Sequence, residues 1–175
     1  MHTNRVTVRL LAGCLALLGS NEGGWAQIIT TVAGNGECCF WGDGGPATQA
    51  GLTPQSVFVD ADGDLHIADS RNQRVRHVDA GTGVITTVAG TGERAFSEDG
   101  GLATESALLE PSGVFVDGSG NIYIAEFARI RRVDGATGII TTVAGMPGEG
   151  SFSGDGGSAT QAHLWVSSGV VIDAM

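Results

Sequence analysis

Short apolar runs alternate with glycine-rich polar segments along most of this chain. Four successive runs begin at residues 56, 64, 74 and 85 and read SVFVD, DLHIAD, RVRHVD and ITTVAG. Runs this short, rich in β-branched residues and bounded by turn residues, predict β-strands. The four runs therefore predict one antiparallel sheet of four strands.

The composition of the four runs differs in a regular way. The first run is continuously apolar, which is typical of a strand covered on both faces. Arginine enters the third run and two threonines enter the fourth, so we expect a gradient from a buried inner strand to a wetter outer strand. The segment 60–64 (DADGD) and its counterpart 117–121 (DGSGN) predict hairpin turns.

The same arrangement recurs along the chain. Three markers, Ile-Thr-Thr-Val-Ala-Gly, Asp-Gly-Gly and Ala-Thr, each return at offsets of 55 or 56 residues. Four strands per repeat at this period predict the blade of a β-propeller, whereas a β-solenoid usually has shorter repeats. The predicted fold is all-β: a propeller fragment of two complete four-stranded blades, with an outer strand at 28–33 and an inner strand at 168–173.

Several segments carry a family resemblance. The stretches 111–117 (PSGVFVD), 120–125 (GNIYIA) and 72–76 (NQRVR) resemble successive strands of an NHL repeat. The stretch 42–48 (GDGGPAT) is similar to the long connection of the secreted bacterial variety, also seen in teneurins. The resemblance implies a partial NHL-repeat propeller over residues 27–175. Glu126 departs from it, because the other repeat has Asp69 there.

The number of repeats bears on how the chain works. Residues 27–175 hold fewer than three repeats, and propellers typically have four to eight blades. An open set of blades leaves faces uncovered that neighbouring repeats normally bury. We therefore expect either a longer protein or self-association that completes the propeller.

The charge balance limits the partners. The chain has 19 acidic residues and nine basic residues, all arginine, for a net charge of −10. An acidic surface repels phosphate backbones, which argues against nucleic acids and anionic membranes. Partners are instead expected to be proteins or small ligands that bind the propeller loop face.

The first 26 residues have the three-part pattern of a secretory signal peptide. Arg5 and Arg9 precede an apolar run at 10–19, and small residues lead to a cleavage site near Ala26. The apolar run is too short to span a bilayer as a helix. The pattern predicts a secreted or periplasmic protein, with a lipoprotein attached at Cys14 as the alternative.

One candidate metal site lies in the first hairpin turn. Asp60, Asp62 and Asp64 are clustered carboxylates of the kind that bind calcium. The turn itself offers another explanation, because aspartates in turns accept hydrogen bonds from nearby backbone amides. The second copy retains only Asp117 of the three, which favours the turn, and we predict no resident metal or other cofactor.

A second candidate is a row of acidic residues in the long connections between blades. The connections of a propeller share one face, so these residues could form a binding face beside the channel. The alternative is that Asp-Gly-Gly only forms a tight turn, which we favour. The recurring residues are Glu37, Glu93 and Glu149, and Asp43, Asp99 and Asp155.

The remaining chemistry is sparse. Cys38 and Cys39 are adjacent and have no counterpart in the other copies, so in an oxidising compartment they are candidates for a disulfide. No catalytic residues are evident. We therefore predict a secreted, non-catalytic binding or scaffold module. The alternative is a fragment of a six-bladed propeller enzyme of the metal-dependent lactonase or lyase type.

Overall fold

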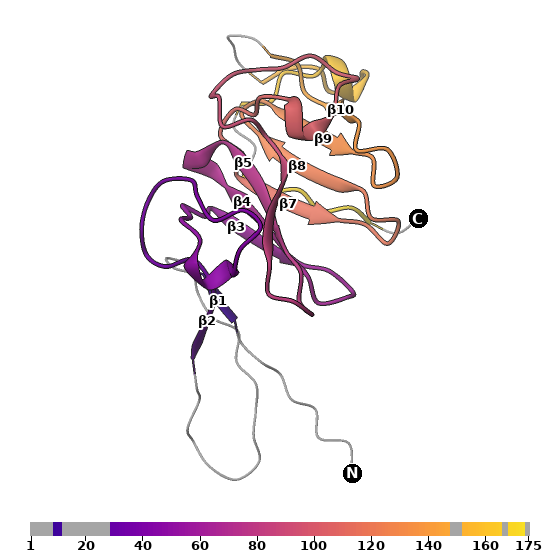
Figure 1. Ribbon diagram of the computed structural model, residues 1–175. Coiled ribbons are helices and arrows are strands. Elements are labelled where there is room, and N and C mark those ends of the chain that lie inside the picture. Colours follow the sequence, from indigo (N-terminus) through magenta and orange to yellow (C-terminus); the bar gives the residue numbers. More distant parts are fainter. Residues whose placement is uncertain (1–8, 12–28, 148–151, 166–167, 174–175) are drawn as a thin grey trace, which may run out of the picture.

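The computed structural model describes residues 9–11, 29–147, 152–165 and 168–173. Two antiparallel sheets of four strands form the body of the molecule (Figure 1). The first sheet contains β3 (Ser56–Val59), β4 (Leu65–Asp69), β5 (Arg74–Val78) and β6 (Ile85–Ala89). The second contains β7 (Gly113–Val116), β8 (Ile122–Glu126), β9 (Arg129–Val133) and β10 (Ile140–Ala144).

Each sheet is a simple meander in which every strand pairs with the next along the chain. The strands coincide with the apolar runs of the repeat, so the predicted all-β fold with two complete propeller blades is confirmed. The register is the same in both blades: Phe58 lies opposite His66, and Phe115 lies opposite Tyr123. The repeated sequence thus forms a repeated structure.

The glycine that ends each fourth strand has a steric role. Gly90 has a φ of +94° and Gly145 a φ of +85°. A Cβ on Gly90 would lie 2.3 Å from the carbonyl oxygen of Gln73, and one on Gly145 would lie 2.1 Å from that of Ala128. Only glycine fits where the outer strand passes so close to the start of the third strand.

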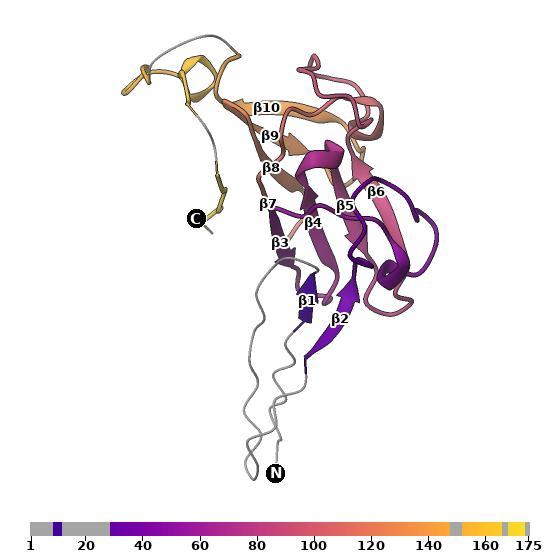
Figure 2. The ribbon, with the colours of Figure 1, turned by 90° about the vertical axis from the view of Figure 1, so that its left-hand side faces the viewer.

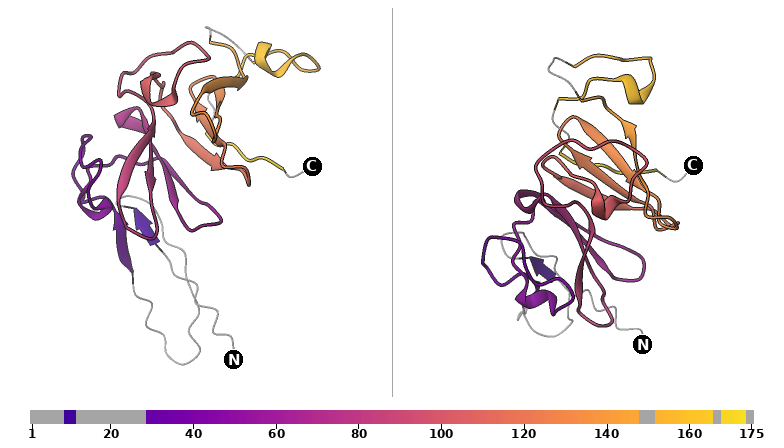
Figure 3. Two further views of the ribbon diagram at one scale, coloured as in Figure 1. Left: turned by 45° about the vertical axis from the view of Figure 1, so that its right-hand side comes forward. Right: turned by 45° about the horizontal axis from the view of Figure 1, so that its top comes forward.

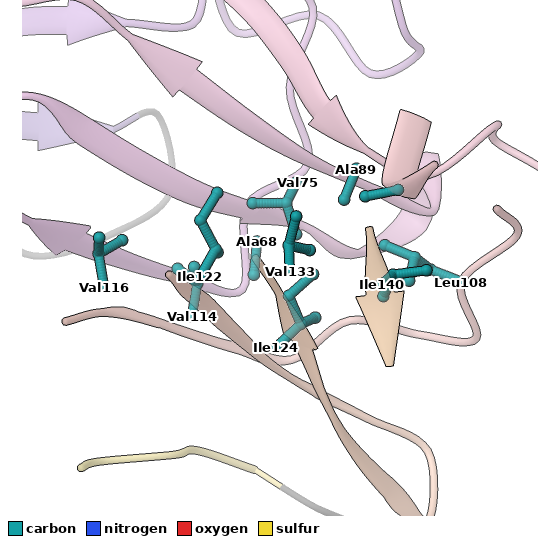
Figure 4. Close-up of a cluster of buried hydrophobic side chains, with 11 residues drawn as sticks. Ala68, Val75, Ala89, Leu108, Val114, Val116, Ile122, Ile124, Val133 and Ile140 are labelled. Atoms are coloured by element: carbon teal, nitrogen blue, oxygen red, sulfur yellow. The ribbon is translucent and has the colours of Figure 1, made fainter. Parts of the chain in front are cut away.

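The two sheets stack face to face as neighbouring blades (Figures 2 and 3). Figure 4 shows the cluster that fills the space between them, in which Ala68 and Val75 of the first blade meet Ile122, Ile124 and Val133 of the second. Nearer the inner strands, the rings of Phe58 and Phe115 are 4.8 Å apart. Apolar burial between sheets therefore holds the blades together.

The opposite face of the first blade is covered by the segment that precedes it. Leu65, Ile67, Val78 and Ile85 occupy the positions that Ile122, Ile124, Val133 and Ile140 occupy in the second blade. They pack against Ala33 of β2 (Thr30–Ala33) and the residues that follow it. The predicted outer strand at 28–33 is therefore present as β2.

A short 3₁₀ turn follows each Asp-Gly-Gly segment. These turns are η1 (Ala47–Gln49), η3 (Ala103–Glu105) and η4 (Ala159–Gln161). Their alanine carbonyls accept hydrogen bonds from the amides of Gly34, Gly90 and Gly145, each at 2.9 Å. The Ala-Thr marker thus recurs because it fastens the long connection to the end of the preceding strand. A fourth turn, η2 (Ser70–Asn72), joins β4 to β5.

The two ends of the described chain complete the picture. The segment 168–173 has no assigned strand, although the sequence predicts an inner strand there. It nevertheless runs beside β7, since a Cβ on Gly113 would lie 2.7 Å from Cα of Gly169. At the other end, β1 (Arg9–Leu11) pairs in parallel with β2, although its residues belong to the predicted signal peptide. Most of residues 1–26, including Cys14 and Ala26, lie outside the described residues.

One expectation about burial is wrong. Arginine in the third run predicts a wetter strand, but the side chains of Arg76 and Arg131 are fully buried. Each is neutralised by carboxylates from the long connection and from the neighbouring strand. A buried charge of this kind is stable only with such partners.

Candidate functional site

The first hairpin turn uses its carboxylates internally. Asp60 Oδ1 accepts hydrogen bonds from the amides of Asp62, at 3.1 Å, and Asp64, at 2.9 Å. Its other oxygen lies 2.9 Å from Nε2 of His66. Burial opposes ionisation of Asp60, but the hydrogen bonds from His66 and Asp64 outweigh it and lower its pKa.

The second hairpin turn repeats this arrangement without the other two aspartates. Asp117 accepts from the amides of Ser119 and Asn121, each at 2.9 Å, and from the hydroxyl of Tyr123 at 3.3 Å. The turn geometry therefore needs only the first aspartate. Among the residues that the structure describes, no three histidine, cysteine, aspartate or glutamate side chains are grouped for metal binding. Calcium binding by Asp60, Asp62 and Asp64 stays the alternative that the sequence does not favour, and the prediction of a turn without a resident metal stays a prediction.

Two histidine rings lie in tilted contact beside the first turn. The rings of His66 and His77 are 5.0 Å apart, and Nε2 of His77 lies 2.9 Å from Asp64 Oδ2. Nδ1 of His66 is buried and has no hydrogen-bond partner among the described residues. Burial and the neighbouring His77 lower the pKa of His66 below its ordinary value, despite the hydrogen bond with Asp60.

A buried ionic network ties the long connection to the first blade. Arg76 Nη2 donates to Asp43 Oδ1 at 2.6 Å, and its Nη1 lies 3.5 Å from Asp69 Oδ2. Thr87 on the outer strand donates to the second oxygen of Asp43 at 2.7 Å. Asp69 also accepts from the amide of Thr53 at 2.7 Å. The network thus joins three strands, β4, β5 and β6, to two points of the long connection.

The second blade builds the same network with one change. Arg131 lies 3.0 Å from Asp99 and 3.3 Å from Glu126, and Thr142 donates to Asp99 from its amide and its hydroxyl. Glu126 additionally pairs with Arg129 at 2.6 Å. The glutamate at this position therefore serves two arginines.

These networks bear on the predicted acidic binding face. Asp43 and Asp99 carry the Asp-Gly-Gly turns but are engaged by arginine and threonine, which gives them an intramolecular role. The residues Glu37, Glu93 and Asp155 are exposed on three different connections. Glu149 lies outside the described residues. A binding role for the exposed members stays a prediction.

A polar groove of about 510 Å³ opens where the long connection meets the turn between β4 and β5. The long connection contributes Gly36, Cys38 and residues 52–55 to its lining. The turn between β4 and β5 contributes Arg71, which is exposed, and Gln73. Connections between blades and turns between second and third strands thus meet at one end of the sheets.

The far end of the groove reaches the next blade. The side chain of Gln73 accepts a hydrogen bond from the amide of Glu110 at 2.7 Å, and the carboxylate of Glu110 pairs with Arg94 at 2.6 Å. Gln73 and Glu110 both have a φ of +53°, unusual for residues other than glycine. Neighbouring repeats therefore share this groove.

One member of the cysteine pair, Cys38, lines the groove. Cys38 and Cys39 are exposed free thiols, with their sulfur atoms 3.7 Å apart. The Cys39 thiol donates to the sulfur of Cys38, and this hydrogen bond and the proximity of Cys38 raise the pKa of Cys39. A disulfide between them stays a prediction.

The groove and the burial of the arginines were not predicted from the sequence. Asp69 and Glu126 hold equivalent positions in the two repeats, and so do Arg76 and Arg131, but no acidic residue was paired with an arginine. The signal was available, because both repeats end the second strand with an acidic residue and have an arginine in the middle of the third strand. The groove has no such signal, since its residues come from four separate segments.

Comparison with known proteins identifies the repeat. The family model described as the Teneurin NHL domain matches residues 91–152. Teneurin-3 of Danio rerio is 41% identical over 95 residues, covering 47% of this chain. The protein SUPPRESSOR OF QUENCHING 1, chloroplastic, of Arabidopsis thaliana is 30% identical over 73 residues, covering 42% of this chain. The NHL resemblance is therefore confirmed over part of the chain.

The matches are partial in both directions. This chain spans 4% of the length of Teneurin-3 and 7% of that of the plant protein. A crystal structure of a Bacteroides thetaiotaomicron protein of unknown function superposes with a TM-score of 0.54 at 23% identity, covering 64% of this chain and 28% of that one. That likeness supports the fold alone. None of the helices in the described part of the chain is long and apolar enough to cross a membrane.

Proposed function

We propose that this chain, which carries NHL repeats of the kind found in the teneurin NHL domain, is a secreted, non-catalytic binding module. The observation that carries the proposal is the groove between Cys38, Arg71 and Glu110. It is polar and open, and two neighbouring repeats form it. Binding residues are often found on loops held by a rigid scaffold, and here two stacked sheets supply that scaffold.

The chemistry of the groove favours recognition over catalysis. The ionisable side chains that line it are one thiol, one guanidinium and one carboxylate. The carboxylate of Glu110 is already paired with Arg94, and Arg71 is exposed and free to meet a ligand carboxylate or backbone carbonyl. We therefore expect a polar peptide segment or a small polar ligand.

A peptide array tests the binding role. The labelled chain is applied to immobilised peptides of varied charge, and the expected result is a subset of sequences bound with micromolar affinity. Arg71→Ala removes the exposed wall of the groove and should abolish the selected signals. Asp62→Ala changes an exposed residue in the β3–β4 turn, at the opposite end of the sheet, and should leave the signals intact. If both variants lost the peptide signals equally, the groove would not be the binding site.

The same protein preparation tests the alternative that the chain is part of an enzyme. Metal content is measured after purification, and hydrolysis of simple lactones is followed with added divalent ions. A module that only binds shows no turnover above a blank. Stoichiometric tightly held metal together with lactone hydrolysis would overturn the non-catalytic assignment in favour of a propeller enzyme of the lactonase type.

Secretion is tested separately from binding. The positively charged start, the apolar run at 10–19 and the small residues before Gln27 motivate it. Expressed with its own N-terminus in a bacterial host, the protein is expected outside the cytoplasm, beginning at Gln27. Mass spectrometry of the exported protein reads the N-terminus directly, and an intact Met1 on exported protein would contradict cleavage.

A further inference from the structure

The adjacent cysteines form a feature that the repeat does not require. The next repeat has Arg94 and Ala95 at the corresponding positions. Both thiols are exposed, and their sulfur atoms are already within 3.7 Å of each other. Cys38 also lines the groove, so any covalent change at the pair alters the groove wall.

The backbone at the pair is held in an unusual conformation. Cys39 has a φ of +92°, which residues with a side chain rarely adopt, whereas Ala95 in the next repeat does not have a positive φ. The carbonyl of Cys39 packs so closely on Gly51 that a Cβ there would lie 2.1 Å from its oxygen. Trp41 forms a bridge with the same glycine. The main chain is therefore fixed, and the two sulfur atoms approach each other by side-chain rotation.

We propose that Cys38 and Cys39 are a reversible modification site, at which a small-molecule disulfide such as glutathione disulfide converts the two thiols to a vicinal disulfide. The proposal is independent of the binding function, because it concerns the thiols and not the ligand of the groove. A vicinal disulfide closes a ring through one peptide unit. It therefore fixes the two cysteine side chains, which rotate freely as thiols, in one arrangement beside the groove that Cys38 lines.

The exchange balances with one disulfide oxidant per cysteine pair. The thiolate of Cys38 attacks a sulfur of glutathione disulfide and releases one glutathione thiolate, which takes up the proton that Cys38 lost. The Cys39 thiol then loses its proton and attacks the Cys38 sulfur of the mixed disulfide, releasing the second glutathione. The products are the Cys38–Cys39 disulfide and two glutathione thiols. The hydrogen bond from Cys39 to the Cys38 sulfur keeps Cys39 protonated until this second step.

The geometry makes the disulfide easy to reduce again. Adjacent Cα atoms are about 3.8 Å apart across a trans peptide. Most disulfides join Cα atoms about 4.4–6.8 Å apart, and shorter or distorted links are strained and more reducible. Strained, exposed disulfides are the labile or regulatory ones. The pair is therefore suited to switching and not to permanent stabilisation.

Mass spectrometry of the whole chain tests the proposal. Cys14→Ser is introduced first, so that only the pair can react. The folded protein is incubated with glutathione disulfide, and we expect the loss of two hydrogens, the loss of both free thiols and a monomer on a non-reducing gel. Dithiothreitol should restore both thiols. A stable glutathione adduct on both cysteines, or a disulfide-linked dimer, would overturn the proposal.

Single substitutions and unfolding supply the controls. Cys39→Ser, in the Cys14→Ser background, should stop at the mixed disulfide on Cys38, because no second thiol is present to release glutathione. The same reaction in guanidinium chloride shows how much vicinal disulfide forms in the unfolded chain, where the two cysteines are only neighbours in sequence. The folded protein is expected to form at least tenfold more vicinal disulfide relative to mixed disulfide than the unfolded chain. Equal ratios would mean that the fold does not prepare the site.

Discussion

The most informative single position is the one that holds aspartate in the first blade and glutamate in the second. Asp69 is fully buried and accepts hydrogen bonds from Thr53 and Asn72. The second repeat has no equivalent of Asn72, and Glu126 accepts from Arg129 instead. Both carboxylates reach the buried arginine of the third strand. The substitution is therefore compensated by a change of partner.

This compensation predicts a large effect of removing the charge. Glu126→Gln keeps the size of the side chain but leaves Arg129 and Arg131 buried beside a neutral amide. Breaking a buried ion pair typically costs about 3–5 kcal/mol, so we expect about 3 kcal/mol less free energy of unfolding. Denaturant titration measures it. Glu105→Gln, at an exposed position, is the matched control and should change stability by less than about 0.5 kcal/mol.

The buried His66 beside His77 predicts a dependence of stability on pH. The folded protein lowers the pKa of His66 below its ordinary 6.5, mainly by burial. The unfolded chain therefore binds the proton first as the pH falls. Stability is complete above pH 6.5 and declines below it until His66 also titrates in the folded state. Unfolding titrations between pH 8 and 5 should show this decline.

A variant separates His66 from the other titrating groups. His66→Tyr introduces the residue of the second repeat, where the hydroxyl of Tyr123 donates to Asp117. It keeps a donor for Asp60 and removes the titrating ring. The decline in stability just below pH 6.5 should become shallower. An unchanged slope in His66→Tyr would show that another group causes it.

The elements themselves were largely predictable because their signals are periodic. Runs of four or five residues rich in β-branched side chains at a fixed spacing specify strands, and the turns at 60–64 and 117–121 follow from aspartate and glycine. The 3₁₀ turns were not predicted, since Ala-Thr has no strong local preference and its role appears only when Gly34 or Gly90 binds the alanine carbonyl. The burial of Arg76 was missed for the same reason. One partner, Asp43, lies 33 residues away in sequence, and the other, Asp69, lies on the neighbouring strand.

The end of the fourth strand provides a test at the level of elements. Gly90→Ala places a methyl group against the Gln73 carbonyl at a positive φ, so both a clash and backbone strain oppose it. Strain of this kind costs about 1–3 kcal/mol, and the clash adds to it. Thermal unfolding should therefore show a clearly lowered midpoint.

The control for this prediction lies in a turn. Gly118 has no neighbour within 4 Å of a Cβ placed there and does not have a positive φ. Gly118→Ala should be neutral or slightly stabilising, because it restricts the unfolded chain without a clash. If Gly90→Ala were as harmless as Gly118→Ala, the tight passage at Gly90 would not exist in solution.

At the scale of the whole molecule, the packing of one blade against the other provides stability. Val114 and Val116 of the second blade are 7% and 8% exposed, because the first blade covers them. Their equivalents in the first blade, Val57 and Val59, are 40% and 50% exposed. The same sequence is thus buried in one blade and uncovered in the other, and the difference is the presence of a preceding blade. The face formed by Val57 and Val59 is shaped to pack against another blade.

That face carries the prediction of self-association. Alternate residues of a strand share one side, so Val57 and Val59 form a single apolar strip along β3. In residues 27–175, the removal of 1–26 also takes away β1, the partner of β2, and exposes a strand edge that is able to pair with another chain. Light scattering on this mature chain should therefore give masses above the monomer at micromolar concentration.

The double variant Val57→Thr, Val59→Thr should shift the distribution toward monomer, because it reduces the apolar area while keeping β-branched residues in the strand. Leu102→Thr alters an apolar residue that is 43% exposed and lies before η3 in the second repeat, and it should leave the masses unchanged. A mature chain that unfolds cooperatively as a monomer at high micromolar concentration would show that two stacked blades are stable alone.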